Sequence, residues 1–134
     1  MNENILMNEK ETDIRSWLSE NGKRYFDDMY YCRSLGAASN IKSIGLILLD
    51  LAENNTNPSV LLSQINTVLS YYAEKRGSSS YAILRAVKMI GRKINNESAN
   101  TSSPLSDIIK LSISSFNEDA NQRLNKLKEY GWNV

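Results

Sequence analysis

Apolar residues recur at steps of three and four along most of the chain, which is the spacing of one face of an α-helix. Strict alternation, the mark of a half-buried strand, is nowhere sustained. The pattern therefore predicts an all-α fold, a single-domain bundle of five to six helices with a long C-terminal helix. The expected helices cover residues 12–20, 23–34, 40–54, 58–76, 80–94 and 104–130.

Turn-forming residues separate these segments. Asn21 and Gly22 are expected to end the first helix, because both tolerate the left-handed backbone of a helix C-terminus. Asn57 and Pro58 indicate a helix start, with the asparagine as the cap and the proline at the first helical position. Gly77 is expected to end the fourth helix.

The helix at 40–54 is the most apolar of the set. Ile44, Leu48 and Leu51 lie on one stripe, and Leu46 and Leu49 widen it to most of the circumference. A helix that is apolar on most sides is usually buried on most sides. We therefore expect it to be the central helix of the bundle.

The same breaks divide the chain into four parts. We expect a flexible N-terminal tail at 1–10, a helical core domain at 11–94, a flexible loop at 95–103 and a long C-terminal helix at 104–134. The loop is expected because its sequence, NNESANTSS, holds no apolar side chain besides alanine. The last helix carries one narrow apolar stripe, so it is predicted to pack on the core or on a second copy, which would make a homodimer.

The composition argues against catalysis. The chain has no His, the commonest general base and metal ligand, and a single cysteine, Cys32. Asp50 and Glu53 share one side of a helix, but two carboxylates do not make a metal site. No nucleotide-binding loop or nucleophile elbow is present. We therefore expect no enzymatic activity, no catalytic residue, no metal and no cofactor.

The sequence pattern favours a soluble, cytoplasmic protein. Residues 1–11 carry three glutamates and lack the basic start and apolar core of a signal peptide. The longest apolar run, at 44–49, is far shorter than the roughly 20 residues that a membrane span needs. A lone cysteine fits a reducing compartment. The usage of Asn, Lys and Ile favours a bacterial or phage origin.

The net charge of +1 hides an uneven distribution. Residues 1–30 hold 7 acidic and 4 basic side chains, whereas residues 31–105 hold 4 acidic and 8 basic ones. Residues 106–134 hold 4 of each. A basic middle is thus offset by an acidic start, which either folds over the basic middle or leaves it open as a binding surface.

One basic stretch favours nucleic acid. No acidic residue lies between Glu74 and Glu97. The segment also resembles a helix-turn-helix, with Gly77 in the turn and Ile83 as the inward anchor of the second helix, although the residues on either side of the glycine are polar where apolar groups are usual. The candidate nucleic-acid contacts are Lys75, Arg76, Ser79, Tyr81, Arg85, Lys88, Arg92 and Lys93.

Aromatic residues favour a protein partner instead, since Tyr, Trp and Arg most often anchor interfaces. Neighbouring residues on a helix point about 100° apart, so we expect one ring of each adjacent tyrosine pair to lie nearer the solvent. The predicted interface residues are Tyr30, Tyr31, Tyr71 and Trp132. The leading hypothesis is a small non-enzymatic regulatory protein that docks on a partner protein, as a regulator, inhibitor or immunity-type factor. A helix-turn-helix-like transcriptional regulator is the alternative.

Overall fold

The computed structural model describes residues 7–31, 36–129 and 131 of the chain, and within them it contains six α-helices and no strand. This confirms the predicted all-α bundle. The helices are α1 (Glu9–Ser16), α2 (Glu20–Tyr30), α3 (Ala37–Asn54), α4 (Pro58–Lys75), α5 (Tyr81–Asn100) and α6 (Leu105–Glu129). Among these helices, none combines the length and the apolar character that crossing a bilayer requires.

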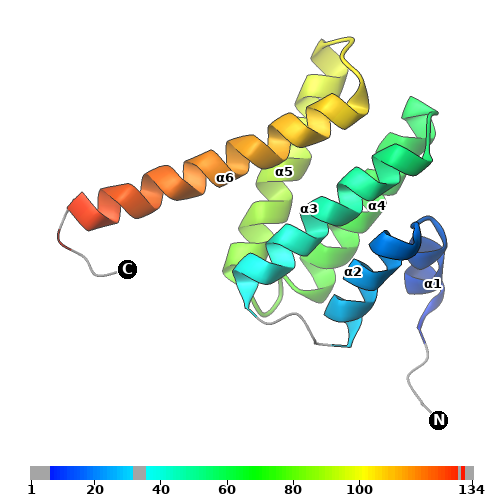
Figure 1. The fold of residues 1–134 in the computed structure, drawn as a ribbon, viewed down its shortest axis with the longest axis horizontal. Helices are drawn as coiled ribbons and strands as arrows, with labels where there is room; N and C mark the ends of the chain where they lie inside the picture. Colours follow the sequence, from blue (N-terminus) through cyan, green and yellow to red (C-terminus); the bar gives the residue numbers. More distant parts are fainter. Residues whose placement is uncertain (1–6, 32–35, 130, 132–134) are drawn as a thin grey trace.

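Helix α3 lies at the centre of the bundle. It contacts α2, α4, α5 and α6, and Figure 1 shows it running through the middle of the molecule. Ile44, Ile47, Leu48 and Leu51 of this helix are fully buried. Buried residues from each of the other five helices join them in one core, so the bundle, with α6 as the last member, is held by burial of apolar surface.

Side-chain caps fix where several helices begin. Asn8 and Glu11 form a reciprocal capping box at α1, with N···O distances of 2.8 and 2.9 Å. Asn57 accepts from the backbone N–H groups of residues 59 and 60, ahead of Pro58, as the sequence predicts. Helix α3 follows Gly36, whose φ of 83° is a left-handed value that most side chains disfavour.

The first break in the chain falls earlier than the sequence predicts. Helix α1 ends at Ser16 and α2 begins at Glu20, so Gly22 lies inside α2 rather than ending a helix. Ser19 caps α2, and the Asp50 carboxylate from α3 accepts hydrogen bonds from Ser19 N at 2.9 Å and from Ser19 Oγ. A Cβ on Gly22 would lie 2.2 Å from Asp50 Oδ2. The glycine therefore permits this close approach between α2 and α3.

The predicted loop at 95–103 is wrong over most of its length, because α5 continues to Asn100. Asn95 and Asn66 exchange two side-chain hydrogen bonds, of 2.9 and 3.2 Å, where α5 meets α4. Lys93 pairs with Glu97 one turn further on. These contacts compensate for the low helix propensity of asparagine and serine. Helix α1 begins at Glu9, so residues 9 and 10 of the predicted tail are helical.

Helix α6 joins the core along its first half only. Ile108, Ile109, Ser112 and Phe116 are buried, and the Ser112 hydroxyl donates to the Ile108 carbonyl at 2.8 Å. Residues 120–126 are all exposed. Figure 1 shows the end of α6, drawn towards red, projecting past the bundle with none of the other described helices beside it.

Candidate functional site

The basic residues at the end of α4 are turned towards the N-terminal helices. Lys75 Nζ lies 3.7 Å from Glu11 Oε2, and Arg76 donates to the Met29 carbonyl. Glu11 is only 3% exposed. The acidic start of the chain thus pairs with this part of the basic segment, although the Lys75 side chain stays 55% exposed.

The basic residues of α5 are interrupted by carboxylates. Arg85 Nη2 lies 3.3 Å from Asp119 Oδ2 of α6, and Lys93 Nζ lies 3.7 Å from Glu97 Oε2. Lys88 and Arg92 are exposed. Helix α6 crosses α5 (Figure 1) and contacts it closely. The helix that resembles a recognition helix is therefore partly covered by the chain's own last helix.

The turn between α4 and α5 contains Ser79, and Tyr81 lies at the start of the helix that follows it. A Cβ on Gly77 would lie 2.3 Å from a backbone carbonyl oxygen of the preceding turn, which explains the glycine. Ser79 Oγ donates to the Arg76 carbonyl at 3.2 Å, so Ser79 stabilises the turn. Tyr81, the first residue of α5, is 78% exposed. It is the most exposed large apolar side chain among the described residues.

The predicted interface residues lie in different surroundings. Tyr31 is 44% exposed and Tyr30 is half-buried, with the two rings in edge contact at 5.0 Å between centroids. Trp132 lies outside the described residues. Tyr71 is only 6% exposed and its hydroxyl donates to Glu11 Oε2 at 2.6 Å. The prediction that Tyr71 anchors an interface is therefore wrong, because the N-terminal helices cover this end of α4.

Tyr72 is buried as well, so the expectation that one ring of this pair lies nearer the solvent is wrong. Burial raises the pKa of both phenols, and the hydrogen bond to Glu11 raises that of Tyr71 further. Tyr71 stacks on Phe26 with ring centroids 6.1 Å apart. Among the described residues, the Tyr72 hydroxyl has no hydrogen-bond partner. This end of the bundle is a closed cluster of rings around one carboxylate.

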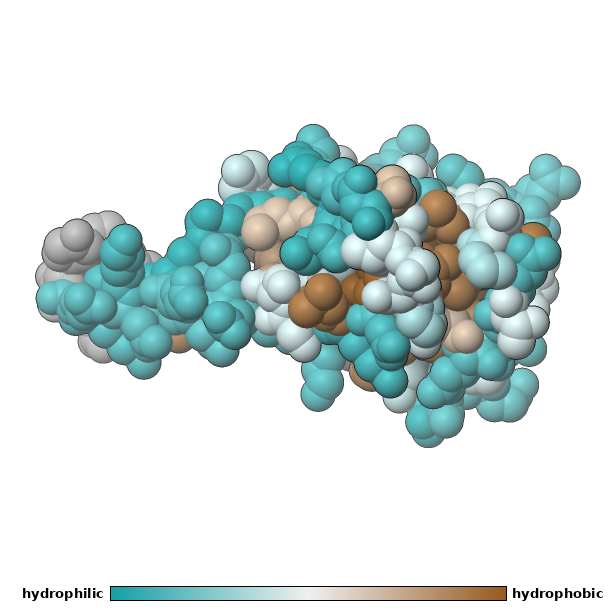
Figure 2. All heavy atoms as spheres, turned by 90° about the horizontal axis from the view of Figure 1, so that it is seen from above, coloured by the Kyte–Doolittle hydropathy of each residue, from teal (hydrophilic) through white to brown (hydrophobic). Residues whose placement is uncertain are grey.

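An apolar groove of about 770 Å³ opens on another side of the molecule, between α3, α5 and α6. Small residues on two of its walls leave the space open: Ala37, Ala38 and Gly45 on α3, and Ala82 on α5. Larger apolar residues complete the walls: Ile41, Leu46 and Leu49 on α3, Ile90 on α5, and Ile113 and Phe116 on α6. Figure 2 shows brown surface gathered on the body of the molecule, whereas the projecting end is largely teal.

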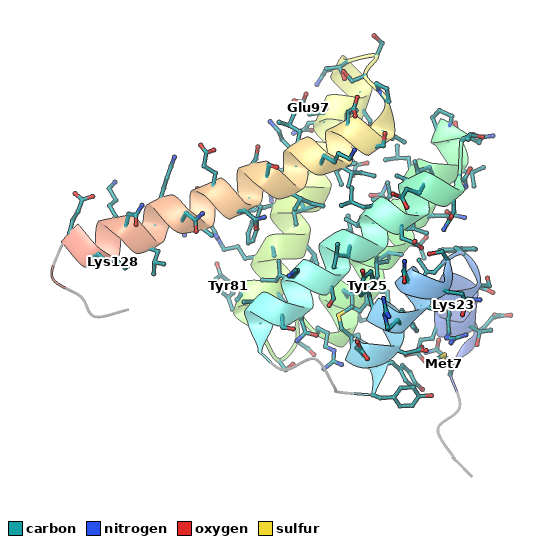
Figure 3. The ribbon with its side chains drawn as sticks, viewed as in Figure 1. Met7, Lys23, Tyr25, Tyr81, Glu97 and Lys128 are labelled. Carbon is teal, nitrogen blue, oxygen red and sulfur yellow. The ribbon has the colours of Figure 1, made fainter. Side chains whose placement is uncertain are left out.

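The rim of this groove carries cations and an aromatic ring. Tyr81 and Arg85 come from α5, and Lys42 comes from α3. Among the described lining residues, none is acidic. In Figure 3, Tyr81 stands at the start of α5, on the side of the bundle from which α6 projects towards Lys128.

The apolar residues of α3 predict a fully buried helix, but in the structure part of them forms a wall of this groove. Helix α3 is apolar on most sides, which predicts burial on most sides. Its side with Ile41, Leu46 and Leu49 is instead half-buried and forms a groove wall. The excess of apolar residues on α3 therefore marks an open wall in addition to the core.

The candidate carboxylate pair has a structural role. Asp50 accepts from Ser19 and, at 3.2 Å, from Asn54 Nδ2, while Glu53 is exposed. Within the described residues, no three potential metal ligands are grouped together. Cys32 lies outside those residues.

Comparison with known proteins returns no family model, no curated protein and no solved structure that matches this chain. Its function is therefore inferred from the groove and from the charges around it.

Proposed function

We propose that this chain is a non-enzymatic, cytoplasmic regulatory protein, and that its α3–α5–α6 groove receives an apolar helical segment of a partner protein. The observation that carries the proposal is the groove of about 770 Å³ with the 78% exposed ring of Tyr81 at its rim. Amphipathic helices bind in hydrophobic grooves of this kind. An exposed tyrosine beside such a groove is a typical interface anchor.

The charges near the groove also favour a protein over a nucleic acid. Arg85 is held by Asp119, and Lys75 is held by Glu11 at the far end of α4. Phosphate binding needs several cations on one face, and these ion pairs divide the basic segment. A protein partner needs only the apolar walls and a polar rim, which the groove supplies.

A matched pair of alanine substitutions tests the proposal. Ala82 is exposed and lines the groove, whereas Ala99 is exposed on the same helix outside it. Glutamate is a good helix former, so Ala82→Glu and Ala99→Glu should both fold. With tagged protein used as bait in its source cells, we expect the wild type and Ala99→Glu to retain a stoichiometric protein that Ala82→Glu loses by at least about tenfold. Equal capture by all three, or recovery of nucleic acid alone, would sink the proposal.

The exposure of Lys88 and Arg92 on one face of α5 supports nucleic-acid binding as the second candidate function. On that reading, duplex DNA binds with an affinity that falls steeply with salt, and each lost phosphate contact reduces the salt slope by about 0.9. Reversing both residues to glutamate would abolish binding. Under the leading proposal, the wild-type protein shows no salt-sensitive affinity for duplex DNA, and the double reversal leaves partner capture unchanged.

A further inference from the structure

The second half of α6, residues 117–129, meets the bundle at its start, where Asp119 pairs with Arg85 and Ala120 lines the groove, whereas residues 121–126 are all exposed. We call this segment the arm; at 1.5 Å per residue it is about 20 Å long. It contains three asparagines, which are poor helix formers, and one i,i+4 ion pair, Asp119–Arg123 at 3.1 Å. Such a helix depends on packing for most of its stability. Ala120 and Leu124, which is 40% exposed, continue the apolar stripe of α6 along the arm.

The groove on the same chain offers a surface long enough for the end of the arm. Its wall on α3 extends over residues 37–49, about 20 Å. Its wall on α6 extends over residues 113–120 and includes the start of the arm. One chain therefore presents both an uncovered amphipathic helix and a groove that fits one, side by side.

The charges along the arm favour a second copy in antiparallel orientation. Glu118 and Asp119 make its start acidic, and Arg123, Lys126 and Lys128 make its later part basic. Antiparallel pairing of two arms brings the basic part of each beside the acidic start of the other, whereas parallel pairing brings like charges together. Antiparallel helix dipoles are also mutually favourable.

An antiparallel pair centred near residue 122 fits the positions of the apolar residues. It sets Leu124 of one chain against Ala120 of the other and lays residues 124–129 along the α6 wall at 115–120. The arrangement has two-fold symmetry, so both arms and both grooves are covered at once.

We propose that two copies of this chain exchange arms: the starts of the two arms pair with each other, and the end of each arm lies in the groove of the other copy. If the groove receives a partner's helix, as proposed above, the arm and that helix compete for the same site. Dimerisation then regulates docking, and this consequence rests on the proposed function. Two short helix contacts bury little area, and we expect a weak dimer with a dissociation constant on the order of 10 µM.

Sedimentation velocity on the purified full-length chain, from about 1 µM to about 1 mM, tests the exchange without any partner. Leu124→Asp on the arm and Ala82→Glu in the groove should each raise the dissociation constant by at least about tenfold. The matched controls are Leu111→Asp, another exposed leucine of α6 outside the groove lining, and Ala99→Glu. Both controls should dimerise like the wild type, and circular dichroism should show all four variants folded.

Mixing the two defective variants gives the decisive result. A heterodimer of Leu124→Asp with Ala82→Glu retains one intact arm and one intact groove that fit each other, so the mixture should dimerise more tightly than either variant alone. A wild type that stays monomeric over the whole range overturns the proposal. So does a dimer that Leu124→Asp weakens and Ala82→Glu leaves unchanged, because the arms would then pair outside the groove. Neither outcome affects the capture experiment on the proposed function.

Discussion

At the end of the bundle where α1 and α2 cover α4, polar and aromatic side chains are tightly paired. Arg15 donates two hydrogen bonds of 2.9 Å to Asp27, and Glu11 receives the hydroxyl of Tyr71. On the α3–α5–α6 side, comparable aromatic and apolar residues line an open groove. Sites that bind other molecules commonly lie where surface remains available, on a scaffold stabilised elsewhere. The first region therefore holds the fold, and the second is where we expect docking.

The largest expected difference comes from substituting by alanine one glycine at the closely packed α2–α3 contact and one in the groove wall. In Gly22→Ala the new Cβ collides with Asp50 Oδ2, and moving that carboxylate breaks its hydrogen bonds to Ser19. We expect a loss of about 2 to 4 kcal/mol in the free energy of unfolding, measured by urea denaturation.

Gly45→Ala is the matched substitution in the groove wall. Its Cβ would lie 3.3 Å from Ile113 Cδ1, the end of a side chain that borders open space. Because alanine gains about 1 kcal/mol of helix propensity over glycine, the free energy of unfolding should stay the same or rise by up to that amount. Equal losses in the two variants would contradict the contrast between a closed and an open region.

The adjacent tyrosines of the closed region differ in their hydrogen bonding. Tyr71→Phe removes a hydrogen bond to a carboxylate that is 3% exposed, and we expect it to cost about 1.5 to 3 kcal/mol of stability. Tyr72→Phe removes a buried hydroxyl that has no partner among the described residues, so it should be neutral or stabilising. Urea denaturation of the two variants measures both effects, and the reverse order would show that the Glu11 contact is not stabilising.

Alkaline pH should weaken the same cluster. The pKa values of Tyr71 and Tyr72 are raised in the folded state above the value of about 10 in the unfolded chain. Above pH 10 the unfolded state therefore binds fewer protons than the folded state, and stability falls as the pH rises, by up to about 1.4 kcal/mol per pH unit for each tyrosine. Below pH 10 these groups add no pH dependence. The decline should be shallower in Tyr71→Phe than in the wild type, and identical slopes would exclude Tyr71 as its source.

Removing the end of the arm should have the smallest effect on stability. Residues 121–126 are all exposed, and Phe116 is the last described residue of α6 that is buried. A chain truncated after Ala120 should keep its free energy of unfolding to within about 0.5 kcal/mol. A loss of several kcal/mol in thermal or urea denaturation would place the arm within the folded core.

The sequence predicted the fold better than the site, for physical reasons that particular residues illustrate. The start of α4 follows from Asn57 and Pro58, whose effects are local. Gly22 lies inside α2 rather than at a helix end, and the reason for a glycine there is its contact with Asp50, a residue far along the chain. The extension of α5 past Ile94 likewise depends on the pairing of Asn95 with Asn66.

The groove was harder to predict from the sequence, because it depends on how α6 packs across α3 and α5. The apolar excess on α3 and the basic spacing on α5 were both visible in the sequence, but periodicity does not say which helix covers which face. Tyr81 was selected as a nucleic-acid contact from its place at a helix start. Its position at the groove rim gives the same exposed ring a different expected partner.

Site-specific photo-crosslinking shows which of the two regions contacts a partner protein. A photoreactive phenylalanine analogue replaces Tyr81 at the groove rim in one variant. In another it replaces Tyr31, the exposed ring at the end of α2. After irradiation in source cells, we predict a covalent adduct with a protein other than this chain from position 81 and none from position 31. An adduct from position 31 together with none from position 81 would contradict the assignment of docking to the groove.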